Sequence, residues 1–130
     1  MDILRAGLES TAYCFASIYD RLQAVNSDME EIIASGAGLL QSPTWMQMMA
    51  DVLGKPVTAS AVAEASSRGA ALLGLETANL LDDLADAPVP LDMTFDPNMQ
   101  RHNRYQETME EQQELYDLMI REQGIGSRDQ

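Results

Sequence analysis

The feature that most constrains the fold is one helix with clear start and stop signals. Ser42 and Pro43 mark its beginning, because serine can accept hydrogen bonds from the free amides of a first turn and proline there loses no required hydrogen bond. We predict that the helix continues to Leu53, since Gly54 can adopt the left-handed conformation that ends a helix and Pro56 prevents its resumption. Its expected buried face comprises Trp45, Met46, Met49, Ala50 and Leu53. A short helix with such a face must pack against other elements.

Short segments on both sides of this helix are typical of β-strands. Residues 30–34 indicate a strand that enters a glycine-containing turn at residues 35–38, and residues 55–59 indicate a second strand, at a sheet edge. Two strands make a poor sheet alone, since an isolated pair is only marginally stable. We therefore predict a helix-rich α/β fold with few strands, in which part of the sheet is missing.

The rest of the chain is predicted to be mainly helical. Apolar residues recur at helical spacing over residues 2–25, and the Ala- and Ser-rich segment 61–80 predicts a helix that packs tightly against another backbone. Prolines indicate an irregular linker over residues 81–103. A terminal helix over residues 104–123 and a frayed tail at residues 124–130 complete the chain.

Composition excludes several classes of partner. The formal net charge of −13 disfavours binding to nucleic acid, which draws its affinity from Lys and Arg replacing phosphate counterions. No apolar run approaches the roughly 18 residues needed to span a bilayer, and the start lacks a secretory signal, so we expect a cytoplasmic protein without a membrane partner. The single cysteine, Cys14, excludes an intrachain disulfide, and its small and aromatic neighbours predict a buried thiol.

The remaining reactive side chains are better explained by structure than by catalysis. His102, the only histidine, has no cysteine or acidic partner at metal-ligand spacing, so we expect it on the surface or in a linker. Asp82, Asp83 and Asp86 are more typical of a solvated helix end than of a cation site. The methionines around Met48 favour a helical core over an adaptable binding groove.

Three segments stand in a characteristic order and spacing: DILRAGLESTAY at residues 2–13, ASGAGLLQSPTW through ADVLGKPV at residues 34–57, and EASSRGAAL at residues 64–72. Together they resemble the C-terminal domain of the FGGY carbohydrate kinases, with gluconate and xylulose kinases as plausible relatives. The second segment is the most specific, because it is similar to the family's adenosine-binding turn, helix and following strand. The resemblance implies a partial actin/hexokinase-like (ribonuclease H-like) domain, with residues 1–80 as the C-terminal portion of its nucleotide-binding domain.

The same resemblance implies a site for ATP or ADP with Mg²⁺, whose metal ligands lie outside this chain. The residues implied to bind the nucleotide are Ser35, Gly36, Ala37, Gly38, Ser42 and Gln47. A nucleotide needs backbone amides and a surface poor in side chains, and a glycine turn before a helix supplies both. Ser42 could cap its helix, reach the nucleotide, or do both.

The chain departs from the family pattern within this turn. Many members carry two adjacent glycines where this sequence has Gly36 and Ala37, followed by Gly38. If the turn needs positive φ at Ala37, the cost is of order 1 kcal/mol. The alternative is a shift of the turn onto Gly38.

The resemblance places the phosphate-binding loops, the sugar site and the catalytic aspartate N-terminal to the matching segment. We therefore expect a fragment of an ATP-dependent kinase of a sugar or sugar acid. It would contribute the adenosine-binding side, be inactive alone, and meet sugar only with the missing N-terminal domain. One alternative is a non-enzymatic interaction or oligomerisation module, possible as a homo-oligomer, because removing the rest of a sheet leaves unpaired edges and an apolar patch. Another is an unrelated helical scaffold with accidental similarity.

Overall fold

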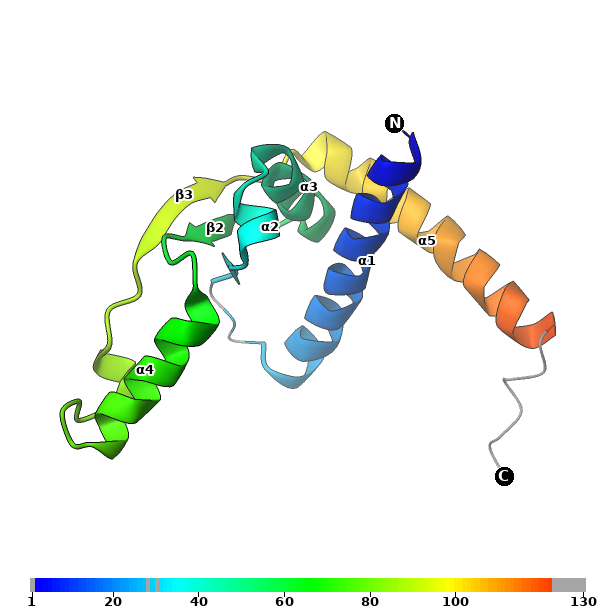
Figure 1. Cartoon of the computed structure of the whole chain (residues 1–130). Coiled ribbons are helices and arrows are strands. Elements are labelled where there is room, and N and C mark those ends of the chain that lie inside the picture. The colour runs from blue at the N-terminus through cyan, green and yellow to red at the C-terminus, as the bar shows by residue number, and fades with distance from the viewer. Residues whose placement is uncertain (1, 28, 30, 123–130) are drawn as a thin grey trace, which may run out of the picture.

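The computed structural model describes residues 2–27, 29 and 31–122, which form a helix-rich α/β structure with one small sheet (Figure 1). The elements in chain order are α1 (Asp2–Val25), β1 (Ile33–Ala34), α2 (Ala37–Leu40), α3 (Pro43–Leu53), β2 (Val57–Ser60), α4 (Ala65–Thr77), the 3-10 helix η1 (Leu84–Asp86), β3 (Leu91–Phe95) and α5 (Met99–Glu122). The predicted fold class is confirmed.

The three strands pair in the order β1-β2-β3. β1 runs parallel to β2, with Ala34 opposite Ala59, and β3 runs antiparallel to β2, with Val57 opposite Phe95. β2 is therefore the central strand, and the prediction of an edge strand at residues 55–59 is wrong. Its second partner comes from a segment rich in prolines, which the sequence pattern did not identify as a strand.

Helix α3 lies at the centre of the molecule, with apolar packing on two sides. One core cluster joins it to α1, with Tyr105 and Met109 of α5 packed against it; its buried members are Ala12, Tyr13, Ala16, Met48, Met49 and Val52. A second cluster joins α3 to the sheet, through Ala34, Met46, Ala50, Val57 and Ala59. The methionines of α3 lie in the core, as predicted, and α3 connects the two halves of that core.

The predicted signals at both ends of α3 are confirmed. Ser42 is the N-cap, Pro43 occupies the first turn, and Gly54 is the C-cap in the left-handed conformation, at φ 64°. The preceding strand is shorter than predicted, since only Ile33 and Ala34 of residues 30–34 are paired as strand.

Helix α4 projects from the sheet, away from α1 and α5 (Figure 1). All of its 13 residues are described and none is buried, so the prediction of a tightly packed helix is wrong. Arg68 donates a hydrogen bond to the Pro88 carbonyl, and Glu76 accepts one from the Leu84 amide at 3.1 Å. Small residues permit close approach of another backbone, but these two hydrogen bonds join α4 to the segment that follows it.

The predictions for the linker, for the start of the terminal helix and for Cys14 need correction, and the prediction for the tail stays untested. Residues 81–103 are not uniformly irregular, because they contain η1, β3 and the start of α5 at Met99, so the terminal helix begins before residue 104. Cys14 is exposed rather than buried, since the buried face of α1 is formed by its neighbours on the opposite side of the helix. The frayed tail predicted for residues 124–130 lies outside the described residues.

Candidate functional site

The segment between β1 and α3 is an open turn that a strand enters and a helix leaves. Ala34 is buried at the end of β1, whereas Ser35, Gly36, Ala37 and Gly38 are all exposed. The Leu40 amide donates to the Gly36 carbonyl at 3.0 Å, which closes the turn into the short helix α2. The bend is therefore not covered by its own side chains.

Gly36 carries the unusual backbone conformation of the turn, at φ 102° and ψ 128°. A Cβ built at this position would meet no atom within 4 Å, so space does not require glycine here. The positive φ requires glycine here, because L-residues with a side chain adopt this conformation only with strain. The backbone at Gly36 is consequently bare on its outer side.

Ala37 causes no backbone strain in this turn. Among the described residues, Asn79 is the only non-glycine with positive φ, and Ala37 begins α2 in a helical conformation. The positive φ falls on Gly36 alone, and Gly38 lies inside α2, so the turn has not shifted onto Gly38. The effect of Ala37 is a methyl group added to an exposed surface.

Ser42 acts as a cap, as predicted. Its side-chain oxygen accepts a hydrogen bond from the Trp45 amide at 3.3 Å, and its backbone carbonyl accepts from the Trp45 and Met46 amides, each at 2.9 Å. A serine hydroxyl retains one donor hydrogen when it accepts. Ser42 can therefore cap α3 and still donate a hydrogen bond outward.

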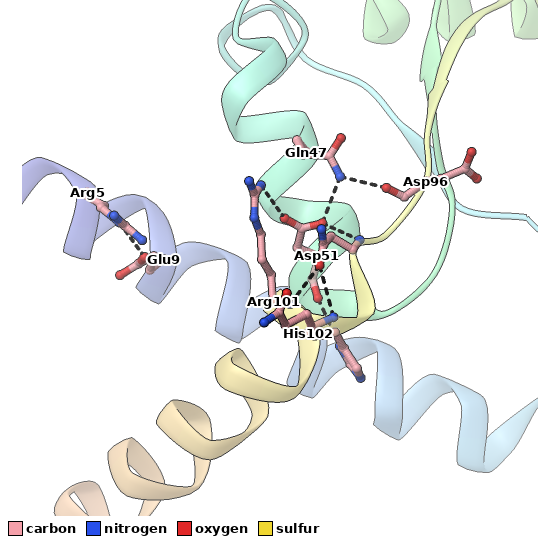
Figure 2. Close-up of polar contacts among 9 residues, drawn as sticks. Arg5, Glu9, Gln47, Asp51, Asp96, Arg101 and His102 are labelled. Atoms are coloured by element: carbon pink, nitrogen blue, oxygen red, sulfur yellow. Dashed lines mark hydrogen bonds and ion pairs between the residues drawn. The ribbon is translucent and has the colours of Figure 1, made fainter.

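Gln47 belongs to a different network from the turn. Its amide nitrogen donates to the Asp51 carboxylate at 2.9 Å and to the Asp96 carbonyl at 2.7 Å (Figure 2). A side-chain amide has two hydrogens to donate, so both are used within the protein. Gln47 ties α3 to the end of β3, and only its carbonyl oxygen remains available to a ligand.

Asp51 is a buried carboxylate that sequence reasoning missed. It is 1% exposed, and its Oδ1 accepts from Gln47 and, at 2.8 Å, from the backbone amide of Asn98. The guanidinium of Arg101, whose side chain is 63% exposed, lies 3.3 Å from the other oxygen. A buried charge needs such partners. Figure 2 shows these groups converging from α3 and the start of α5. The only sequence signal was an acid next to core positions of the predicted helix.

His102 completes this junction. Its Nδ1 lies 3.0 Å from the Asp51 carbonyl oxygen, and its ring covers Gly54. A Cβ at Gly54 would lie 2.6 Å from the Cε1 atom of His102. His102 is half-buried at the contact between α3 and α5, so the expectation of a surface or linker role is wrong.

Other possible site features are sparse in the part of the chain that the structure describes. Within that part, no three His, Cys, Asp or Glu side chains are grouped to hold a metal ion, and no helix is long and apolar enough to cross a membrane. A surface depression of about 280 Å³ is lined by Tyr19, Met29, Glu31, Ile32, Lys55, Pro56 and Thr58. It does not include the residues of the turn.

Comparison with known proteins gives a consistent result. Residues 1–78 match the family described as "FGGY family of carbohydrate kinases, C-terminal domain". Glycerol kinase of Aliivibrio fischeri is 36% identical over 107 residues, which are 80% of this chain and 21% of that protein. Xylulose kinase of Staphylococcus epidermidis is 29% identical over 112 residues, or 82% of this chain and 22% of that protein. The chain therefore spans about a fifth of the length of these curated relatives.

A solved structure shares the same fold. The crystal structure of xylulose kinase from Rhodospirillum rubrum matches 90% of this chain and 24% of its own, with a TM-score of 0.66 and 27% sequence identity. The match extends beyond residues 1–78, so it includes part of the segment after α4.

Proposed function

Because the chain belongs to the FGGY family of carbohydrate kinases, we propose that it forms the adenosine-facing wall of an ATP-dependent carbohydrate kinase. The observation that carries the proposal is the exposed turn at Gly36, entered by a strand and left by a helix. Such a turn offers backbone amides and a surface free of side chains to a flat ligand. The chain's relatives are kinases of glycerol and xylulose, and we propose a sugar, sugar acid or related polyol as the phosphate acceptor.

The individual residues take different parts in this proposal. Gly36, Ala37 and Gly38 provide the surface, with Ser35 at its entrance from β1. Ser42 fixes the start of α3 through its cap and has one hydrogen left to donate outward. Gln47 supports the site indirectly, because its side-chain amide donates one hydrogen bond to Asp51 within α3 and one to the Asp96 carbonyl, which holds α3 against the end of β3.

The proposal limits this chain to binding and orientation of the nucleotide. Phosphoryl transfer needs an oriented nucleophile, Mg²⁺ and charge stabilisation around the transferred group. In the described residues no acidic cluster could hold the metal. We therefore propose that the catalytic groups and the sugar-binding groups come from the rest of such a kinase, so that this chain alone does not catalyse phosphoryl transfer. We also propose that it works in the cytoplasm, where ATP is available.

Calorimetric titration of the chain with ADP and Mg²⁺ tests this proposal. We expect saturable binding that depends on adenine and is lost in Gly36→Val, because a β-branched residue cannot adopt φ 102° without strain. Gly74→Ala is the matched control, since Gly74 lies in a helix with open space around it, away from the turn. Absence of saturable heat at millimolar ADP, or unchanged binding by Gly36→Val, would contradict the proposal.

One observation favours a second candidate, an interaction or oligomerisation module derived from such a kinase. On α1 the apolar side chains of Phe15, Ile18 and Leu22 are each about half exposed and share one face at helical spacing. Contiguous exposed apolar surface often marks a contact with another chain. Light scattering distinguishes the two functions: self-association without adenine-dependent binding would support the module, and a monomer that binds ADP would support the adenosine site.

A further inference from the structure

The distal half of α5 continues an apolar stripe beyond the core of the protein. Tyr105 and Met109 pack against the cluster formed by α1 and α3. At helical spacing, Tyr116 and Met119 follow on the same face, with Leu115 beside them. These three side chains are 57%, 59% and 64% exposed, respectively. Figure 1 shows this half of α5 extending past α1. The apolar stripe of α5 is thus packed against the core near residue 105 and exposed near residue 116.

Acidic side chains cover the opposite face and the margins of this stripe. They are Glu107, Glu110, Glu111, Glu114 and Asp117, and the sequence has no Lys, Arg or His between residues 105 and 120. The ion pairs found in the described part of the chain, Arg5 with Glu9 and Arg101 with Asp51, include none of these acids. The distal half of α5 is therefore an amphipathic helix with a strongly negative polar face.

The negative charge around the apolar stripe favours a positively charged partner. A second copy docked stripe to stripe would bring the acidic margins of the two helices close together, and like charges across an interface oppose association. Nucleic acids and anionic lipid surfaces carry the same sign of charge and are disfavoured for the same reason. A polypeptide with Lys or Arg flanking apolar side chains complements both properties of the helix.

We propose that residues 109–120 of α5 are a docking helix for a basic amphipathic polypeptide segment. The apolar side chains of the partner cover Leu115, Tyr116 and Met119, which extends the packing already present at Met109. Its basic side chains meet the glutamates along the rim and accelerate association by electrostatic steering. This inference does not depend on the adenosine site.

A designed peptide tests the proposal. The probe is a fluorescein-labelled peptide of about 18 residues containing only Leu and Lys at amphipathic helical spacing, measured by fluorescence anisotropy against the full chain. We expect binding that weakens as salt rises, since screening reduces attraction between surface charges. The double variant Leu115→Ser/Met119→Ser should weaken binding at least about tenfold, because the apolar contact is lost. Both side chains are more than half exposed, so the variant keeps the fold.

A matched control separates a specific surface from general hydrophobic attraction. Leu73→Ser/Leu75→Ser removes two exposed leucines from α4, and its affinity for the peptide should equal that of the unaltered chain. The proposal would be overturned if the α4 control lost as much affinity for the peptide as the α5 variant, or if the α5 variant lost none. It would also be overturned if a Leu/Glu peptide bound the chain as tightly as the Leu/Lys peptide. A dimer in light scattering that Leu115→Ser/Met119→Ser dissociates would also overturn it, because a second copy would then cover the stripe.

Discussion

Helices α3 and α4 are similar in length but differ in how the fold uses them. α3 has 11 residues, and six of them, including the charged Asp51, are buried. α4 has 13 residues, all described, and none is buried. α3 is fixed by apolar packing on two sides and by hydrogen bonds to Asp51 from Asn98 and from Arg101 of α5. α4 instead has a few contacts with the segment that follows it.

This difference in burial shows that α3 depends on tertiary contacts more than α4 does. Short isolated helices are marginal in water, and most helical stability in proteins comes from packing. We therefore expect substitutions in α3 to act on global unfolding, and substitutions in α4 to act mainly on the local stability of that helix.

The largest effect is expected from Asp51→Ala. This change removes the acceptor of the Gln47 and Asn98 hydrogen bonds, and with it a polar link between α3 and the start of α5. Hydrogen bonds to a charged group are worth roughly 1.5–3 kcal/mol each, so we expect a loss of about 3 kcal/mol in the free energy of unfolding. Urea denaturation followed by circular dichroism measures it.

Arg101→Ala is the control for Asp51→Ala. The Arg101 side chain is largely exposed, and exposed ion pairs contribute only about 0–1 kcal/mol. A small effect of this variant beside a large effect of Asp51→Ala would show that backbone and amide hydrogen bonds hold the junction. Equal effects of the two variants would show that the ion pair does so instead, contrary to our expectation.

The next largest effect is expected from Gly54→Ala. The substitution places a methyl group at φ 64° and within 3.0 Å of the His102 ring, so we expect a loss of about 2 kcal/mol. In the double variant Gly54→Ala/His102→Ala, the part of this loss in the free energy of unfolding that comes from the steric clash disappears, and the part that comes from positive φ remains. Urea unfolding of the two single variants and the double variant gives the coupling energy, and additive effects would mean that the ring does not press on Gly54.

Gly74→Ala tests α4, and it should stabilise this helix, whereas the substitutions at Asp51 and Gly54 destabilise the protein. Gly74 lies inside α4 with open space where a Cβ would be, so alanine removes the cost of glycine in a helix, about 0.5–1 kcal/mol. We expect slower amide hydrogen exchange within α4 and an unchanged urea midpoint for the chain. A raised midpoint would show that α4 unfolds together with α3 and would weaken the contrast between them.

Local signals predicted α3 well and its neighbours less well. Ser42, Pro43 and Gly54 act on their own helix termini, so the sequence alone indicates both ends. α4 has a composition suited to close packing, but whether a backbone lies against it depends on distant segments. β3 was missed because the prolines around it indicated an irregular linker, although Leu91, Met93 and Phe95 alternate with polar residues at the spacing of a strand.

The candidate site shows the same division. The exposed turn and the capping role of Ser42 followed from glycine and serine chemistry, together with the resemblance to the kinase family. The partners of Gln47 and Asp51 lie about 50 positions away along the chain, at Asp96, Asn98 and Arg101. No spacing rule connects residues so far apart, so the junction between α3 and α5 could only be found in the structure.

The smallest effect on stability is expected from Tyr13, a residue of α1 in the cluster that joins α1, α3 and α5. Burial raises the pKa of Tyr13 above its ordinary value, and the nearby Glu9 carboxylate raises it further. Its ring also meets Tyr105 edge to face, at 6.1 Å between centroids. The folded chain therefore holds the phenol proton to higher pH than the unfolded chain does.

The sign of the resulting pH dependence follows from proton binding. Above the ordinary tyrosine pKa near 10, the unfolded state has lost a proton that the folded state keeps, so stability falls as pH rises until the folded pKa is passed. Below the tyrosine pKa of the unfolded chain, near 10, the Tyr13 contribution is constant. We expect the urea midpoint of the unaltered chain to fall more steeply, as pH rises above about 10, than that of Tyr13→Phe. Tyr116→Phe removes an exposed phenol and should retain the steep fall; the same slope in all three proteins would mean that ionisation of Tyr13 is not linked to the packing around α3.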